Sequence, residues 1–322
     1  MKNLKNISIF LFVAILFSCG NQQSNNTKTE VIISDTIKSV NNDIDYINEK
    51  EINSKEDKSE SKTDIIEEII PIDFKMTKEE KLISSFCKDF NYKKIERGFN
   101  KLQNKTTNKR KYVWQTDLER EIINDFFEQI IEFRVEIQEE ENPAVYSVYT
   151  NKISLIKTKD GRIAFYKINR LENVKINEEW REQNVVLQKD SSSLLKKLQA
   201  DFKKTYDRKL DFDELFETQI VYGSHCGFAG MEPKYRIKMN KLVELKDSTT
   251  LIKWLKSATI EIQLYAIDGI LNLKKNGLKF DTSTLELIEL IENKEGEAYT
   301  CSGCTHWNRP INEIIEKIKK SP

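Results

Sequence analysis

The sequence predicts an α+β protein, in which two helices and an antiparallel β-meander are followed by a mainly α-helical C-terminal subdomain. Three observations indicate this fold class. Apolar side chains recur at helical spacing up to residue 131, the period falls to two from residue 133, and the helical period returns after residue 191. The region from residue 72 onward is long enough to bury a sizeable core, and we divide it into subdomains at 72–190 and 191–322.

The first predicted helix begins after Thr77. Thr77 and Glu80 form a capping box, in which the hydroxyl and the carboxylate satisfy free backbone donors reciprocally. The helix then presents an apolar face made of Leu82, Ile83, Phe86 and Phe90. Cys87 falls on the same face, which favours a buried and unreactive thiol.

A second capping box, Thr116 with Glu119, predicts the second helix. Its apolar stripe would consist of Leu118, Ile122, Ile123, Phe126, Phe127, Ile130 and Ile131. Two helices of this kind need an apolar partner surface, which the residues after 131 are expected to supply.

The period of two identifies the expected sheet. Short strands are expected at 133–137, 145–150, 153–157 and 162–168. The last two flank the sequence TKDG, a hairpin turn in which Gly161 supplies the left-handed conformation. Consecutive strands with tight links predict an antiparallel meander that packs on the two helices.

The C-terminal subdomain is expected to contain a helix near 191–202, a helical hairpin at 248–277, a helix at 281–294 and a closing helix from 310. The helical hairpin resembles one unit of a HEAT-type repeat, and the resemblance covers about one repeat. Pro310 sets the first turn of the closing helix, whose inward face would be Ile311, Ile314, Ile315 and Ile318.

The first residues have the order of an export signal. Lys2 and Lys5 precede an apolar run at 7–17 that is too short to span a bilayer. The following Leu-Phe-Ser-Cys, ending at Cys19, resembles the lipobox of bacterial lipoproteins. The resemblance implies a signal peptide at 1–18, and a lipid-modified Cys19 carrying fatty acyl chains such as palmitate. It also implies a protein held by lipid to a membrane of the bacterial envelope, facing the periplasm or the cell surface. The alternative is an ordinary secretory leader that is cut after Ser18.

Residues 19–71 differ from everything that follows. They are polar and charged, and their scattered isoleucines keep no sustained period. Such a composition cannot bury enough apolar surface to offset chain entropy, so we expect a disordered tether that holds the body away from the membrane.

Two glycine-rich segments, 221–233 and 294–307, are unusual in this background. Together they contain five of the ten glycines, both histidines and three of the five cysteines. We expect irregular loops that meet in space. In an oxidising compartment a disulfide would join two of the three thiols, Cys226, Cys301 and Cys304.

Zinc is the alternative to a disulfide at these segments. Three thiolates, from Cys226, Cys301 and Cys304, with one imidazole from His306 or His225, make a sound tetrahedral ligand set. A thiol-dependent function of the Cys301–Cys304 pair is a further hypothesis, although the pair is expected in a loop rather than at a helix N-terminus. No other cofactor is predicted.

The chain has 52 basic and 52 acidic residues, which argues against a nucleic-acid partner. A local basic patch is formed by Lys93, Lys94, Arg97, Lys101, Lys105, Lys109, Arg110 and Lys111. It would bind anionic lipid headgroups or polysaccharide, or it is a solvated helix and loop balanced by the acidic residues at 136–142.

The sequence contains no phosphate-binding loop, dinucleotide glycine fingerprint, GxSxG elbow or HExxH helix. The hypothesis it favours is a non-catalytic binding or scaffold module of the envelope, with an envelope protein or a polysaccharide as partner. The alternative hypothesis is a zinc-binding or thiol-dependent protein centred on the two glycine-rich segments.

Overall fold

The computed structural model describes residues 75–320, except 141, 143, 177–178 and 228–229. All of them belong to one compact unit, Ile69–Pro322. The expected signal peptide, Cys19 and the tether at 19–71 lie outside the described residues.

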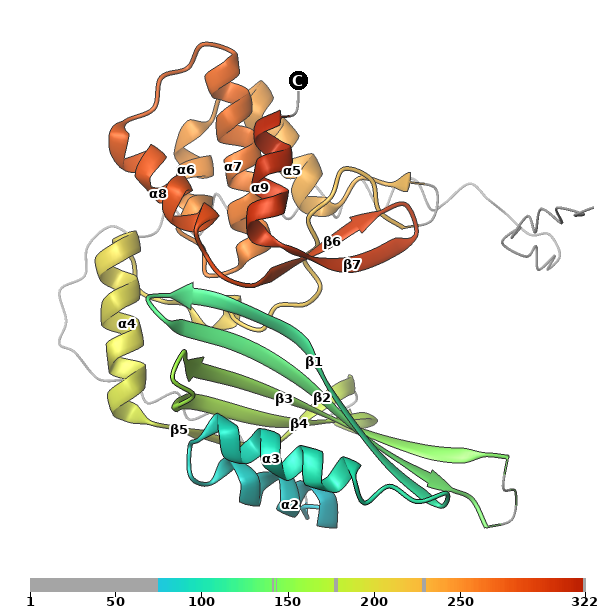
Figure 1. Ribbon diagram of the computed structural model, residues 1–322. Helices are drawn as coiled ribbons and strands as arrows, with labels where there is room; N and C mark the ends of the chain where they lie inside the picture. The colour runs from blue at the N-terminus through green and yellow to red at the C-terminus, as the bar shows by residue number, and fades with distance from the viewer. Residues whose placement is uncertain (1–74, 141, 143, 177–178, 228–229, 321–322) are drawn as a thin grey trace, which may run out of the picture. The chain divides into compact units, whose positions relative to one another are not determined.

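Five long strands form an antiparallel sheet (Figure 1). The strands are β1 (Arg110–Ile123), β2 (Phe126–Gln138), β3 (Tyr146–Thr158), β4 (Ile163–Ile176) and β5 (Glu179–Asp190). Each strand pairs with the next one along the chain, so the predicted meander is confirmed. The turn after β3 is the predicted one, with Gly161 at φ +89°. The strands expected separately at 145–150 and 153–157 are one continuous strand, β3.

The prediction of a helix that begins at Thr116 is wrong, because these residues form the β1–β2 hairpin. Asn124 and Asp125 make its two-residue turn, with φ of +45° and +65°, the pattern of a type I′ turn. The two side chains of the expected capping box do not bond free backbone donors. Both accept a hydrogen bond from the side-chain amide of Gln129 instead. The physical reason is burial on both faces: every residue from Phe126 to Ile131 is buried, so the hairpin has no period of two.

The two helices of the N-terminal half are α2 (Lys78–Cys87) and α3 (Tyr92–Gln103). The Thr77–Glu80 capping box of α2 is present, and Cys87 is buried as predicted, which raises the pKa of its thiol to about 12. The second helix of this half is therefore α3, which precedes the position at which a second helix was expected. Both helices cover one face of the sheet around a core that includes Ile83, Phe99, Phe133, Ile153 and Tyr166.

The opposite face of the sheet packs on α4 (Ser192–Tyr206). Phe202 and Tyr206 of this helix meet Phe126 and Ile156 of the sheet. A short 3₁₀ turn, Phe212–Glu214, follows. The β1–β2 hairpin is therefore enclosed by helices on both sides.

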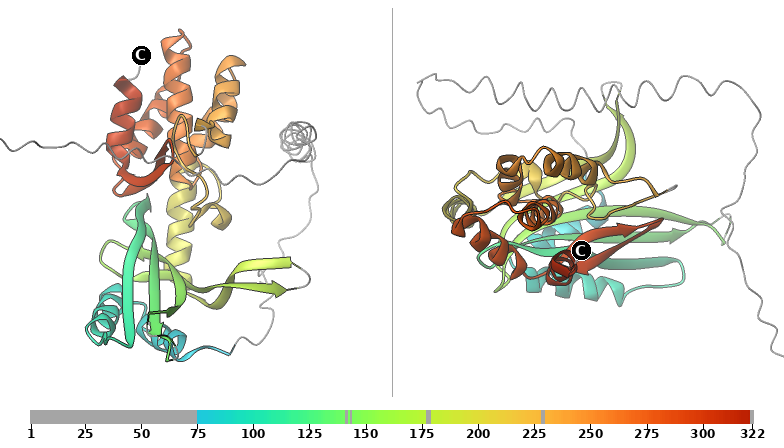
Figure 2. Two further views of the ribbon diagram at one scale, coloured as in Figure 1. Left: turned by 90° about the vertical axis from the view of Figure 1, so that its right-hand side faces the viewer. Right: turned by 90° about the horizontal axis from the view of Figure 1, so that it is seen from above.

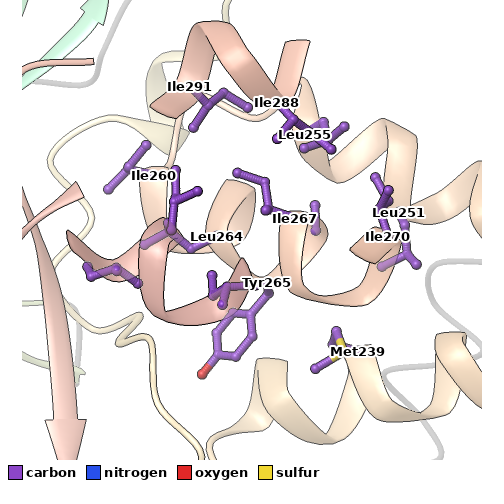
Figure 3. Close-up of a cluster of buried hydrophobic side chains, with 14 of the residues drawn as sticks. Met239, Leu251, Leu255, Ile260, Leu264, Tyr265, Ile267, Ile270, Ile288 and Ile291 are labelled. Carbon is purple, nitrogen blue, oxygen red and sulfur yellow. The ribbon is translucent and has the colours of Figure 1, made fainter. Parts of the chain in front are cut away.

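The C-terminal part contains α5 (Lys234–Glu244), α6 (Ser248–Leu255), α7 (Ile260–Lys275), α8 (Thr282–Glu292) and α9 (Ile311–Lys320) (Figures 1 and 2). Figure 3 shows that α7 lies at the centre of their core, where Leu264, Tyr265 and Ile267 are fully buried. The helical hairpin at 248–277 and the inward isoleucines of the closing helix are confirmed. The resemblance to a HEAT-type repeat stays a prediction.

Candidate functional site

The two glycine-rich segments meet in space, as predicted. Cys226 and Cys301 form a disulfide, with their Cα atoms 5.5 Å apart. The second segment is not an irregular loop, however, but a hairpin of β6 (Glu297–Ser302) and β7 (Thr305–Pro310) with Gly303 in its turn at φ +56°. Its alternating buried residues and its Tyr, Thr and Trp side chains suit a strand.

Backbone hydrogen bonds hold the first segment along β6. The Tyr222 amide donates to the Tyr299 carbonyl at 2.8 Å, and the Cys301 amide donates to the Tyr222 carbonyl at 3.1 Å. At the hairpin tip, Gly227 donates to Gly303, which in turn donates to His225. The loop thus adds a short parallel edge to the hairpin, and the disulfide fastens it there.

Gly223 makes this arrangement sterically possible. A Cβ atom at this position would lie 2.6 Å from the Cys301 carbonyl oxygen, 2.8 Å from the Cys301 sulfur and 3.0 Å from the Cys226 sulfur. Real Cβ atoms essentially never come this close to other atoms, so the disulfide packs directly on bare backbone. The glycine is needed for close approach rather than for a turn.

The remaining residues of the predicted cluster lie at the surface. Cys304 is an exposed free thiol in the β6–β7 turn, and both His225 and His306 are exposed. Over the described part of the chain, no three His, Cys, Asp or Glu side chains are grouped so as to hold a metal ion. The disulfide involves two of the predicted zinc ligands, and zinc binding stays a prediction.

A groove of about 570 Å³ opens beside the disulfide. Cys301 and Gly223 form part of its wall, together with Tyr222, Ser224, Arg236, Asp268, Thr300, Ser302, Trp307, Arg309, Ile314, Lys317 and Ile318. It thus lies between the disulfide-linked loop and hairpin on one side and helices α5, α7 and α9 on the other.

The floor of the groove is a hydrogen-bonded ion pair. Arg236 donates to Asp268 at 2.6 Å and to the Gly223 carbonyl at 3.0 Å, and the Tyr222 hydroxyl donates to Asp268 at 2.9 Å. Burial, and then the Asp268 carboxylate, raise the pKa of Tyr222, so the phenol stays protonated. Burial acts to lower the pKa of Arg236, but Asp268 outweighs it and the pKa is raised. The floor is neutral as a unit.

Within the described part of the chain, the wall formed by β7 carries one unsatisfied donor and one unpaired charge. The buried indole Nε1–H of Trp307 has no hydrogen-bond acceptor within the described residues. The Arg309 guanidinium carbon lies 5.0 Å from the centre of the same indole ring, and Arg309 is not paired with any described carboxylate. The groove therefore has an unsatisfied donor in its wall and the positive charge of Arg309 beside it.

Sequence analysis missed most of these groove residues. Arg236 lies just after the first segment and Trp307 is the last residue of the second, but neither has a local signal that predicts its role. Asp268 had a signal of its own, because an acid in the middle of the apolar run YAIDGILNL needs a buried partner. Nothing local connects it to Arg236, which is 32 residues away.

The predicted basic patch is divided by the fold. Lys94 pairs with Asp89, Arg110 with Glu79, and Lys111 with Glu136. The acidic segment at 136–142 thus neutralises the patch through one described ion pair, Lys111 with Glu136. The other five members are exposed on α3 and on the loop after it.

Comparison with protein-family models, with curated proteins and with solved structures finds no match to this chain. Among the described residues, no helix combines the length and the apolar character needed to cross a bilayer.

Proposed function

We propose that this chain is a lipid-anchored binding module of the bacterial envelope, without catalysis of its own, and that its ligand is an acidic saccharide bound in the groove beside the disulfide. The observation that carries the proposal is the buried Trp307 Nε1–H, which lacks an acceptor although buried donors are nearly always satisfied. An oxygen of the ligand would complete it.

The composition of the lining supports this class of ligand. Ser224 and Ser302 supply exposed hydroxyl groups, and an indole supplies an apolar surface in the same lining. A few polar groups placed around an apolar surface are typical of small-molecule sites. Because the Arg236–Asp268 pair is neutral, Arg309 sets the charge and favours an anionic ligand.

The test follows the Trp307 indole proton by NMR, with its resonance identified by its loss in Trp307→Phe. We expect a uronic-acid trisaccharide to shift this resonance and the neutral trisaccharide to leave it in place. Arg309→Gln should weaken binding about tenfold or more, since hydrogen bonds to charged groups contribute about 1.5–3 kcal/mol.

Arg162→Gln is the matched control, because Arg162 is exposed at the start of β4 and is not a groove residue. It should bind like the parent chain. Equal binding of the neutral and acidic trisaccharides, or an indole resonance that never moves, would contradict the proposed ligand.

The location is tested separately. We expect the protein from its native host to lack residues 1–18, to carry acyl chains on Cys19, and to fractionate with membranes. Cys19→Ala should leave the protein unacylated. A mature chain that retains Met1 and fractionates with the soluble proteins would contradict the lipid anchor.

One observation favours a second candidate. The exposed Cys304 thiol lies three residues after a disulfide-bonded cysteine, which suits a thiol-dependent or zinc-binding protein. Thiol alkylation, intact mass and metal analysis of the purified protein separate the candidates. One disulfide without zinc supports the binding module, whereas free Cys226 and Cys301 with stoichiometric zinc support the metal site.

A further inference from the structure

Helix α3 carries a straight row of positive charge on its outer side. Lys93, Arg97 and Lys101 follow one another at intervals of four residues, so their side chains lie on one line about 6 Å apart. Lys105 and Lys109 continue the basic sequence beyond the helix end. All five residues are exposed.

The row has no internal compensation. Within the part of the chain that the structure describes, none of these five side chains forms an ion pair with a carboxylate. Like charges four residues apart destabilise a helix instead of stabilising it. The fold therefore retains an unfavourable arrangement, which a polyanion outside the protein would turn into a favourable one.

The surroundings extend the positive surface. Residues 75–109 carry ten basic and four acidic residues, a net charge of +6. Of the four acids, Glu80 is buried, and Glu79 and Asp89 are paired with Arg110 and Lys94. The fourth, Glu96, lies on α3 itself and is the one acid of this helix. The other side of α3, with Ile95, Phe99 and Leu102, is buried against the sheet, so the row faces outward. Figure 1 shows α3 lying along the sheet.

We propose that this row docks the protein on the anionic phospholipid headgroups of a bilayer surface. The charges stand side by side on a convex helix and do not converge on one point, so a single small anion could not meet them all. A flat array of headgroups can meet each one. The free energy with which juxtamembrane basic residues bind such surfaces grows in proportion to their number. The row uses none of the groove residues, so both surfaces can act at once.

The experiment measures vesicle binding of the mature chain without its lipidated cysteine, from Gly20 to Pro322. The probes are phosphatidylcholine vesicles with and without about one third phosphatidylglycerol, at physiological salt. We expect binding to the anionic vesicles only. The variant Lys93→Gln/Arg97→Gln/Lys101→Gln should bind on the order of a hundredfold more weakly, since each charge contributes about a fivefold factor.

The matched control is Lys196→Gln/Lys203→Gln/Lys204→Gln, which removes the same charge from exposed positions of α4. This control variant should keep its affinity for vesicles within about threefold of the parent. A loss of net charge is common to both triple variants, whereas the docking surface is removed in only one of them. Equal weakening by both triple variants would overturn the proposal. So would binding to neutral vesicles, or binding to a soluble acidic polysaccharide with none to vesicles. The α3 variant should stay folded by circular dichroism and keep its response to saccharide in the groove.

Discussion

The guanidinium of Arg120 in β1 donates hydrogen bonds to both carboxylate oxygens of Glu261 in α7, at 2.7 and 2.8 Å, although 141 residues separate the two. Glu128 of β2 accepts a third bond from Arg120 at 2.5 Å. All three side chains are at most 1% exposed. Glu261 also accepts from the Tyr299 amide of β6. This buried cluster therefore connects the sheet, the central helix of the C-terminal core, and the hairpin that carries the groove.

Arg120→Met should destabilise the protein by about 3–5 kcal/mol, because it leaves two buried carboxylates without their partner. Urea denaturation measures the change. Arg162→Met is the control: its ion pair with Asp160 is about 60% exposed on both sides, so the loss should stay below about 1 kcal/mol. Similar losses in the two variants would show that the buried cluster has no special role.

Reduction of the Cys226–Cys301 disulfide should lower the free energy of unfolding by about 4 kcal/mol, since the bond closes a loop of 75 residues. Cys226→Ser should have the same effect without reductant. Cys304→Ser should unfold like the parent chain, because the exposed thiol is free. A free energy of unfolding that does not change when reductant is added would contradict the assignment of the disulfide.

Gly223→Ala should destabilise by about 1–3 kcal/mol, the range seen for overpacked sites, and it should slow disulfide formation. The added methyl group would meet the Cys301 carbonyl and both sulfurs. Ser224→Ala, one residue further and exposed, should change neither quantity. Thiol alkylation during refolding reports bridge formation directly. A Gly223→Ala chain that forms the bridge at the parent rate would show that the loop backbone can move aside.

Local signals were enough to predict several elements of the fold. The capping box at Thr77, the turn at Gly161 and the inward isoleucines of the closing helix each act through neighbours within a few residues. The hairpin of β1 and β2 was predicted wrongly because its strands are covered by α2 and α3 on one face and by the distant α4 on the other, which removes the period of two. Helix α3 was expected only as the alternative of a solvated helix and loop, because basic residues dominate its outer face and its apolar side is short.

The candidate site divides in the same way. The clustering of cysteine, histidine and glycine was visible in the sequence, and it predicted that the two segments meet. The groove itself depends on Arg236 from α5, Asp268 from α7 and Trp307 from β7. No spacing rule relates residues on three separate elements, because the tertiary fold alone brings them together.

The β1–β2 turn offers a test that separates hairpin from helix. Asp125→Gly should leave stability equal or improved, since glycine adopts a positive φ without penalty. Asp125→Val should cost about 1–2 kcal/mol, because a β-branched residue resists the left-handed conformation more strongly than aspartate does. In a helix glycine would be the worse residue of the two, so the opposite order of stabilities would contradict the hairpin.

Glu80 gives the protein a defined dependence on acid. Its carboxylate accepts two hydrogen bonds from Arg170, at 2.6 and 2.7 Å, and others from Asn151 and the Thr77 amide. Burial acts to raise the pKa of Glu80, but these bonds outweigh it and the pKa lies below its usual value of 4.5. The folded form therefore binds the proton less readily than the unfolded chain does. The stabilisation is complete above about pH 4.5 and is lost as the pH falls through the folded pKa.

Glu80→Gln should consequently lose about 1.5–3 kcal/mol at pH 7, the range for hydrogen bonds to charged groups. The difference in free energy of unfolding between the variant and the parent should narrow as the pH falls from 5 to 3, because the parent loses the same interaction by protonation. Urea denaturation at each pH measures this difference. Arg170→Gln removes the partner instead, and its free energy of unfolding should also fall less steeply with decreasing pH than that of the parent. A gap at pH 3 as wide as the gap at pH 7 would show that the glutamate acts through shape and not through its charge.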